Sequence, residues 1–231
     1  VKQYTLVAGS EHFDLKVTNI SGTVDLHLVL KQKFDREERD SYTVVVAAYD
    51  GGIPPNMATM TVKINIHDVN DNHPVFMNET YIVVVPESTE QNAVIVQVRA
   101  VDPDFGPNGQ IMYSFSSKTA FTLGNLFGIN NLTGQIFLKR RLNYQDGASY
   151  TLSVTARDMS PESLTSLAKV IVQVQDMNDH APKITINALT NSGHVQISEG
   201  DQQGSFVVHL SVEDLDGGLG GQFSCNLHGS N

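Results

Sequence analysis

The stretch Asp68-Val69-Asn70-Asp71-Asn72-His73-Pro74 decides how the rest of this 231-residue chain is organised. It follows segment 59–67, in which apolar and polar residues alternate, and it precedes the β-branched segment 81–85. Alternation with a period of two is typical of a half-buried β-strand. The stretch is therefore predicted to link two β-rich units. It also carries several of the carboxylate and amide oxygens that hard cations prefer.

The same link returns 108 residues later as Asp176-Met177-Asn178-Asp179-His180-Ala181-Pro182. The other residues that repeat are Tyr42 with Tyr150 and Asp50 with Asp158 at this spacing, and Glu87 with Glu199 and Asp102 with Asp214 at a spacing of 112. A period near 110 residues is too long for a solenoid unit. It fits tandem domains of about the size of an immunoglobulin-like sandwich.

Alternating and β-branched segments predict a chain that is all-β, with no convincing helical period. Strands are expected at 1–7, 13–17, 24–30, 42–48, 59–67, 81–85, 93–100, 111–115, 127–129, 136–138, 150–156, 168–174, 184–186, 195–197, 206–212 and 223–227. Glycine and proline in Asp50-Gly51-Gly52-Ile53-Pro54-Pro55 mark a turn. The expected domains are a repeat at 1–76 that is truncated at its N-terminus, a complete repeat at 77–184, and a repeat at 185–231 that is truncated at its C-terminus.

Composition and charge narrow the function classes. A formal net charge of −10 argues against nucleic acid and against an anionic membrane surface as partners. Because the acids are concentrated around the two links, cation binding is favoured over simple solubility. No signal peptide is recognisable, and no apolar run approaches the roughly 18 residues that a membrane span needs. The single cysteine, Cys225, excludes a disulfide framework and is expected to be a small buried hydrophobe.

Three sequons, at Asn19, Asn78 and Asn131, predict N-glycosylation and so an extracellular glycoprotein. Each triplet is weak evidence by itself.

The acidic motifs predict calcium sites. Calcium takes six to eight oxygens, and one link supplies too few of them. The rest of each repeat adds an early glutamate, an acidic turn such as Asp35-Arg36-Glu37, an Asp-x-Asp loop and a late aspartate. An EF-hand fails on spacing, because Pro107 and Tyr113 stand where a loop beginning at Asp102 requires glycine and glutamate. Ordinary solvated turns are the other alternative, and two copies of the whole set at one period argue against them.

The combined pattern resembles the cadherin repeat. The residues that carry the resemblance are Asp35-Arg36-Glu37, Asp68-x-Asn70-Asp71-Asn72-x-Pro74, Pro86-Glu87, Asp102-x-Asp104-x-Gly106-x-Asn108-Gly109 and Ala156-Arg157-Asp158. Within that superfamily the chain is most similar to protocadherins, and Asp214-x-Asp216-Gly217-Gly218 is similar to part of a protocadherin fourth repeat. The resemblance implies that the chain runs from the second to the fourth repeat. It also implies tandem seven-stranded Greek-key sandwiches in a rod, with about three calcium ions at each complete junction.

The resemblance also implies the ligands of the two junctions. The first junction would use Asp35, Glu37, Asp68, Asn70, Asp71, Asp102, Asp104 and Asp158, with the backbone carbonyls of Val69, Asn72 and Asn108. The second junction would use Glu87, Asp176, Asn178, Asp179, Asp214 and Asp216, with the carbonyls of Met177, His180 and Gly220. Seven carboxylates in the first set and five in the second would face the +6 charge of three calcium ions.

The second junction departs from the family pattern. Its acidic turn reads Leu142-Asn143-Tyr144-Gln145, so amides replace both carboxylates. Because calcium affinity follows the number of charged ligands, weaker binding is expected there, chiefly at the outermost ion on the side of the middle repeat. Replacing Asn143 by Asp together with Gln145 by Glu should raise the affinity. His180 stands where the family has asparagine, and because its implied role is that of a carbonyl, little harm is expected.

These features predict a calcium-rigidified segment of a cell-surface adhesion receptor on the extracellular side of the plasma membrane. The resemblance implies a single-pass protein anchored outside this chain. It would bind another cadherin ectodomain, the same protein on an apposed cell, in antiparallel fashion. The alternative is a heterophilic receptor or mechanical tether that does not self-associate. Paired carboxylates can hydrolyse glycosides, but acids shared by metal ions are not free to titrate, so an enzyme is not expected.

Overall fold

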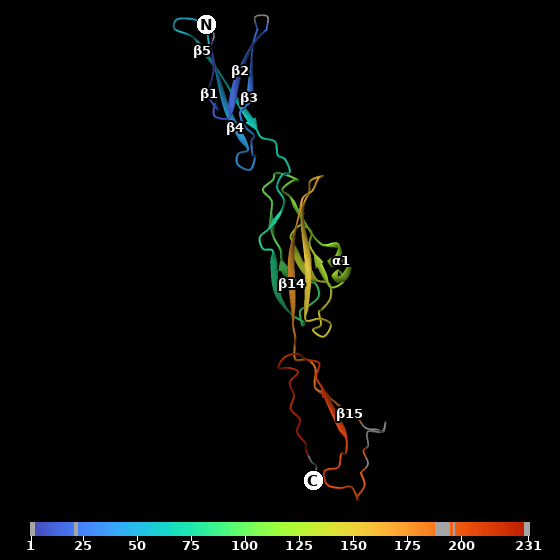
Figure 1. The fold of residues 1–231 in the computed structure, drawn as a ribbon. Coiled ribbons are helices and arrows are strands. Elements are labelled where there is room, and N and C mark those ends of the chain that lie inside the picture. Colours follow the sequence, from blue (N-terminus) through green and yellow to red (C-terminus); the bar gives the residue numbers. More distant parts are fainter. Residues whose placement is uncertain (1–2, 21–22, 188–194, 196, 229–231) are drawn as a thin grey trace. The chain divides into compact units, whose positions relative to one another are not determined.

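The computed structural model describes residues 3–20, 23–187, 195 and 197–228. Within these residues the regular structure is β1 to β16 and one short helix, α1 (Figure 1). Residue contacts divide the chain into two units. The first unit comprises 1–74, 102–110 and 158–164, and the second comprises 75–101, 111–157 and 165–231. This division places two loops of the middle repeat, 102–110 and 158–164, in the first unit. The repeat boundaries expected from the sequence differ from it and stay a prediction.

The first unit contains a three-stranded antiparallel sheet and a hairpin. The sheet has the order β1-β4-β5, with bounds Gln3–Ala8, Ser41–Tyr49 and Met57–Asn65, and the hairpin joins β2, Phe13–Ile20, to β3, Thr23–Leu30. Alternate residues of β4, Tyr42 and Val44, point into a small core that also contains Phe13. Phe34, just before the acidic turn, stacks on Tyr42 with ring centroids 4.7 Å apart. The core therefore holds the base of the turn that carries Asp35 and Glu37.

The middle repeat forms a sandwich of two sheets. One sheet has the order β10-β13-β14-β7, with bounds Ile111–Phe115, Ser149–Asp158, Thr165–Gln175 and Thr80–Pro86. The other has the order β11-β12-β8, with bounds Phe127–Ile129, Gln135–Leu138 and Val94–Gln97, and the short strands β6, Val75–Phe76, and β9, Ala100–Val101, form a further pair. Strands β14 and β7 pair in parallel. The chain passes repeatedly from one sheet to the other, which is the crossing that a Greek-key sandwich requires.

The two sheets of this sandwich enclose one apolar core. Its fully buried side chains include Phe127 on β11, Ile136 on β12, Leu152 on β13 and Val170 on β14. From Leu152 onward on β13 and from Ala168 onward on β14 every second residue is buried, because successive side chains of a strand point to opposite faces. The structure confirms the all-β sandwich class that this alternation predicted.

One element of the middle repeat was not predicted from the sequence. Residues Ser117–Leu123 form α1, whose N-terminus is capped by the hydroxyl of Ser116 accepting a hydrogen bond from the backbone N–H of Thr119. Seven residues span only about two helical turns, too few to display a 3.6-residue period. The serine cap was the one local signal that the sequence offered.

The third part of the chain differs most from expectation. Strands β15, Lys183–Asn187, and β16, His209–Glu213, pair in antiparallel fashion. The strand predicted at 223–227 is wrong, as is the start of the one predicted at 206–212. Residues 195 and 197 are not in a strand, and residue 196 lies outside the described residues. A β-branched or aromatic segment becomes a strand only when its backbone finds a partner ladder, and no described segment pairs with 223–227.

The single cysteine and the membrane-crossing potential of the chain were also predicted from the sequence. The thiol of Cys225 is exposed rather than buried, because the segment around it does not enter a sheet. Among the described residues, no helix has the length and apolarity that a membrane crossing requires.

Candidate metal centres

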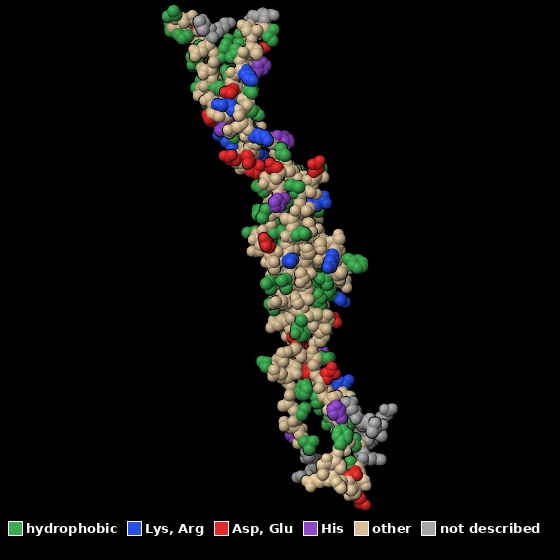
Figure 2. Space-filling model, viewed as in Figure 1, with side chains coloured by type: hydrophobic (Ala, Val, Ile, Leu, Met, Phe, Trp, Pro, Cys, Tyr) green, Lys and Arg blue, Asp and Glu red, His purple; other side chains and the backbone are tan. Residues whose placement is uncertain are grey.

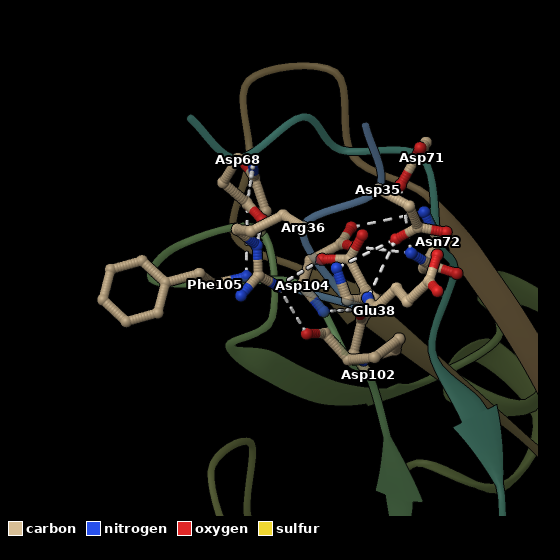
Figure 3. A network of polar contacts seen from close by, with 12 residues as sticks. Asp35, Arg36, Glu38, Asp68, Asp71, Asn72, Asp102, Asp104 and Phe105 are labelled. Atoms are coloured by element: carbon tan, nitrogen blue, oxygen red, sulfur yellow. Dashed lines mark hydrogen bonds and ion pairs between the residues drawn. The ribbon is translucent and has the colours of Figure 1, made fainter. Parts of the chain in front are cut away.

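Three carboxylates expected at the first junction converge in the first unit. Glu37 lies in the turn before β4. Asp68 follows β5, and Asp104 lies in loop 102–110 (Figure 3). One oxygen from each lies within 4.8 Å of the others. Three negative charges at this separation repel one another strongly unless a cation lies among them. The arrangement therefore suits a divalent cation with oxygen ligands.

Arg36 places a positive charge beside these acids. Its guanidinium pairs with Asp68 and Glu37, and its Nη2 donates a hydrogen bond of 2.7 Å to the carbonyl of Pro103. The same group lies 5.8 Å from the centre of the Phe105 ring. In the sequence, Arg36 was recognised only as part of the Asp35-Arg36-Glu37 motif. Its place between two acidic residues already indicated that its charge would offset part of theirs. Arg36 therefore fixes the carboxylates in place without supplying a ligand.

Asp68 is held from several sides. Its Oδ2 accepts a hydrogen bond of 3.1 Å from the backbone N–H of Phe105 and one of 2.8 Å from Nδ2 of Asn108. Burial acts to raise the pKa of Asp68, but these hydrogen bonds and the contact with Arg36 outweigh it and lower the pKa. The carboxylate is thus ionised at neutral pH, as a metal ligand must be.

Asp158 anchors the other loop of this site. It is 1% exposed, and its carboxylate accepts hydrogen bonds from the backbone N–H groups of Ser160 and Leu164 at 2.8 and 2.6 Å. The amide of Asn70 donates to Asp158 at 3.3 Å and to the hydroxyl of Ser160 at 2.8 Å. Burial acts to raise the pKa of Asp158, but these donors outweigh it and lower the pKa. Ser160 is not among the predicted ligands, and its contact with Asn70 orients that side chain.

We expect the replacement of Asp158 by Asn to lower the free energy of unfolding of the metal-free chain by about 1.5–3 kcal/mol at pH 7, the usual value for hydrogen bonds to a charged group. Because the pKa of Asp158 is lowered in the folded state, its contribution is present above the ordinary value near 4 and is lost as the pH falls through the folded-state pKa. Denaturant unfolding in chelator at pH 7 and at pH 3 measures this. An equal difference between the two chains at both pH values would contradict the prediction.

Buried oxygens without partners test whether a cation fits. Among the described residues, four buried side-chain polar atoms have no hydrogen-bond partner, and three belong to predicted ligands: Oδ1 of Asn70, Oδ2 of Asp102 and Oδ1 of Asp176. A buried polar atom without a partner costs about 1–3 kcal/mol. Because Nδ2 of Asn70 is used by its neighbours, its Oδ1 is left for a ligand. All three atoms are oxygens, which are the ligands of calcium.

Other predicted ligands of the first junction lie in the same segments but bond mainly to their own turns. Oδ1 of Asp35 accepts hydrogen bonds from the backbone N–H groups of Glu37 and Glu38, and Oδ1 of Asp71 accepts from the side chain of Asn72. The carbonyl of Val69 accepts from the N–H of Asp71 at 2.9 Å. Asp35 and Asp71 are exposed and are not among the three carboxylates that converge. On the face drawn in Figure 2, acidic side chains gather in a band.

The residues of the second junction reproduce this geometry within the second unit. The N–H of Asp216 donates to Asp214 at 3.0 Å, as that of Asp104 donates to Asp102 at 3.1 Å. The N–H of Gly217 donates to Asp176, which is the counterpart of Asp68. Equivalent contacts at equivalent positions mean that both Asp-x-Asp loops fold in the same way.

Two glycines fix the shape of each Asp-x-Asp loop. Gly106 and Gly218 have φ angles of +64° and +62°, in the left-handed region that favours glycine. A Cβ atom at Gly109 or Gly221 would lie 1.9 or 2.1 Å from the carbonyl oxygen of Asp104 or Asp216. No larger residue fits either position without moving the backbone that carries the second aspartate.

Glu87 and His180 complete the second junction. Glu87 accepts hydrogen bonds from the N–H of Met177 at 2.6 Å and of Tyr144 at 3.0 Å. Nδ1 of His180 lies 2.9 Å from Asp216 and 2.7 Å from Asp179, and these three residues form the cluster that could hold a metal ion. The contact with Asp216 raises the pKa of His180, and the charge of Asp179 adds to the effect. His180 thus makes the contact that Asn72 makes with Asp104 at the first junction, at 2.8 Å. Oδ1 of Asn178 faces Gly220.

The three sequon asparagines, Asn19, Asn78 and Asn131, are all exposed, as an attached glycan requires. Asn19 lies on β2, and Asn78 and Asn131 lie outside the strands. Their glycosylation stays a prediction.

Comparisons with known proteins agree with this geometry. The model of the cadherin domain matches residues 2–67 and 81–175. Protocadherin-12 of Mus musculus is 37% identical over 220 residues, which are 95% of this chain and 18% of that protein, and Protocadherin-18 of Homo sapiens is 36% identical over 98% of this chain and 20% of that protein. The chain therefore spans about a fifth of the length of these relatives.

Solved structures that match this chain are also those of protocadherins. The structure of PcdhgB3 EC1-4 has a TM-score of 0.86 at 34% identity and covers all of this chain and 54% of its own. The cis-dimer structure of protocadherin gammaB7 EC3-6 has a TM-score of 0.75 at 28% identity, over 95% of this chain and 52% of its own. The chain belongs to the cadherin family, and the relatives that it matches are protocadherins.

Proposed function

We propose that this chain is part of a cell-surface adhesion receptor whose junctions are held by calcium. The observation that carries the proposal is the set of unpaired buried oxygens on Asn70, Asp102 and Asp176. The ordered hydrogen bonds that hold the surrounding carboxylates support it, because preformed ligands need less reorganisation when the cation binds. Cadherins are adhesion proteins, so the paired carboxylates are assigned to metal binding rather than to hydrolysis.

The proposed cofactor is Ca²⁺, about three ions at a complete junction. The predicted ligand sets, to which His180 contributes its carbonyl and not its ring, contain oxygens alone and suit calcium. Magnesium demands a tighter octahedral shell and keeps several waters. When bound, calcium supplies positive charge that offsets the repulsion among the carboxylates. The residues of the chain orient those carboxylates, and the hydrogen bonds of Asp68 and Asp158 keep them ionised.

The proposed partner is another cadherin ectodomain, the same protein on an apposed cell. The family supports a role in adhesion, and one matched structure is by its title a cis-dimer of protocadherin gammaB7, so ectodomains of that relative associate with one another. By the same proposal the protein lies on the extracellular side of the plasma membrane, where the exposed sequons are accessible to glycosylation. The net charge of −10 is unsuited to nucleic acid.

Sedimentation velocity of the chain in calcium and in chelator tests this proposal. Concentration-dependent self-association in calcium that disappears in chelator is expected. A chain that binds calcium and remains monomeric would exclude homophilic binding through this segment and favour the heterophilic or tether alternative. Failure to bind calcium at all, measured by titration calorimetry, would overturn the metal assignment itself.

A further inference from the structure

The turn Asn143-Tyr144-Gln145 stands one period after Asp35-Arg36-Glu37 and keeps its shape without its charges. Oδ1 of Asn143 accepts a hydrogen bond of 2.8 Å from the N–H of Gln145. Oδ1 of Asp35 accepts the equivalent bond from Glu37 at 2.9 Å. An amide oxygen therefore preserves the turn, and the loss of charge is not a loss of structure.

The side chain of Gln145 is used for a direct contact. Its Nε2 donates a hydrogen bond of 3.1 Å to the backbone carbonyl of Leu215. Leu215 is the counterpart of Pro103, whose carbonyl accepts from Arg36 at 2.7 Å. At both junctions the turn therefore donates a hydrogen bond to the equivalent carbonyl, but the donor residue differs. At the first junction Arg36 makes this contact and Glu37 is left to converge with Asp68 and Asp104.

Tyr144 fills the space beside the second contact. A Cβ atom at Gly217 would lie 2.9 Å from Cε1 and 3.1 Å from the hydroxyl of Tyr144. The counterpart of Gly217 is Phe105, on which Arg36 stacks. Glycine at position 217 therefore leaves room for the uncharged ring of Tyr144. The equivalent residues of the first junction are Arg36 and Phe105.

The charge count agrees with these contacts. At the six positions that both junctions share, the first junction has six carboxylates: Asp35, Glu37, Asp68, Asp71, Asp102 and Asp104. The second junction has four: Asp176, Asp179, Asp214 and Asp216. The second junction therefore lacks two carboxylate ligands, whose combined charge equals that of one calcium ion. Arg36 offsets one charge of the first junction, so the comparison is of ligands and not of net charge.

We propose that the second junction takes one calcium ion fewer than the first, because amides replace both carboxylates of its turn and the side chain of Gln145 bonds to Leu215, whereas Glu37 at the equivalent position converges with other carboxylates. This inference rests on the proposed calcium binding and adds a difference in stoichiometry. It also makes the second junction partly independent of calcium, since the bond from Gln145 to Leu215 needs no metal.

The number of calcium ions bound per chain at saturation, measured by equilibrium dialysis, tests the proposal. We expect the Asn143→Asp, Gln145→Glu double variant to bind one ion more than the wild type. The matched control, Asp35→Asn with Glu37→Gln, should bind one ion fewer. An unchanged count in the folded Asn143→Asp, Gln145→Glu chain would overturn the proposal, whereas no binding by any chain would overturn the calcium assignment instead.

The Gln145→Ala variant tests the direct contact separately. It should bind as many ions as the wild type, because Gln145 is not a ligand. In chelator, hydrogen exchange at β16 and in residues 214–221 should become faster, because the tie to Leu215 is lost. A lower ion count would show that Gln145 binds metal. Unchanged hydrogen exchange would show that its contact with Leu215 does not stabilise this loop. Either result would overturn the proposal, even if the double variant failed to fold.

Discussion

Withdrawal of calcium is expected to lower the free energy of unfolding by about 2.7 kcal/mol for each site, when the free calcium concentration in the reference buffer is about one hundred times Kd. The physical reason is mass action, because the converged carboxylates exist only in the folded chain. Thermal melts in calcium, in magnesium and in chelator measure the effect. Magnesium should reproduce little of it, because magnesium demands a small octahedral shell and gives up its waters reluctantly. Identical melts in all three buffers would contradict the prediction.

The same prediction can be localised with Asp68. Its carboxylate is one of the three that converge, and it also holds Phe105 and Asn108. Replacing it by Ala should therefore weaken calcium binding at the first junction by at least about 100-fold, beyond the effect of removing residues that only orient ligands. Asp40→Ala is the matched control. It removes the same charge from the same unit, but the described carboxylate contact of Asp40 is with the hydroxyl of Ser41. Equal losses in both variants would mean that only net charge matters.

The sequence predicted which residues of the two junctions are equivalent better than it predicted their contacts. The offsets of 108 and 112 residues correctly paired Asp68 with Asp176 and Asp102 with Asp214, because equivalent loops in repeated sandwiches keep their turn chemistry. The bond from Gln145 to Leu215 could not be predicted in this way. It joins residues 70 positions apart, and its existence depends on how the amide is aimed after folding.

The strands were predictable where a face is buried. Alternation on β13 and β14 identifies Leu152 and Val170 as core residues, and both are fully buried. The segment 223–227 also alternates apolar and polar residues, but it has no partner ladder among the described residues, so the alternation has no effect there. Helix α1 formed although it was not predicted. A capped helix of seven residues is too short to show a helical period in the sequence.

Phe127 should have the largest effect of any single core residue named above. Its ring is fully buried on β11 and meets Tyr150 edge to face, with centroids 5.6 Å apart. Truncation to Ala leaves a cavity in the middle sandwich and should lower the free energy of unfolding by about 3–5 kcal/mol. Denaturant unfolding in calcium measures it. The matched control is Phe121→Ala on α1, where the ring is 92% exposed and the change should stay within about 0.5 kcal/mol.

The Phe127→Ala chain also separates the fold from the metal sites. The side chain of Phe127 is part of the apolar core and not of either ligand set. A domain near the middle of the usual range of about 5–15 kcal/mol keeps several kcal/mol after the expected loss and remains folded at 25 °C. Calcium affinity measured by calorimetry at that temperature should therefore stay within about threefold of the wild type, although the chain melts earlier. A parallel loss of affinity would show that the ligand loops depend on the packing of the whole sandwich, and not on the local hydrogen bonds of Asp68, Asp158 and their counterparts.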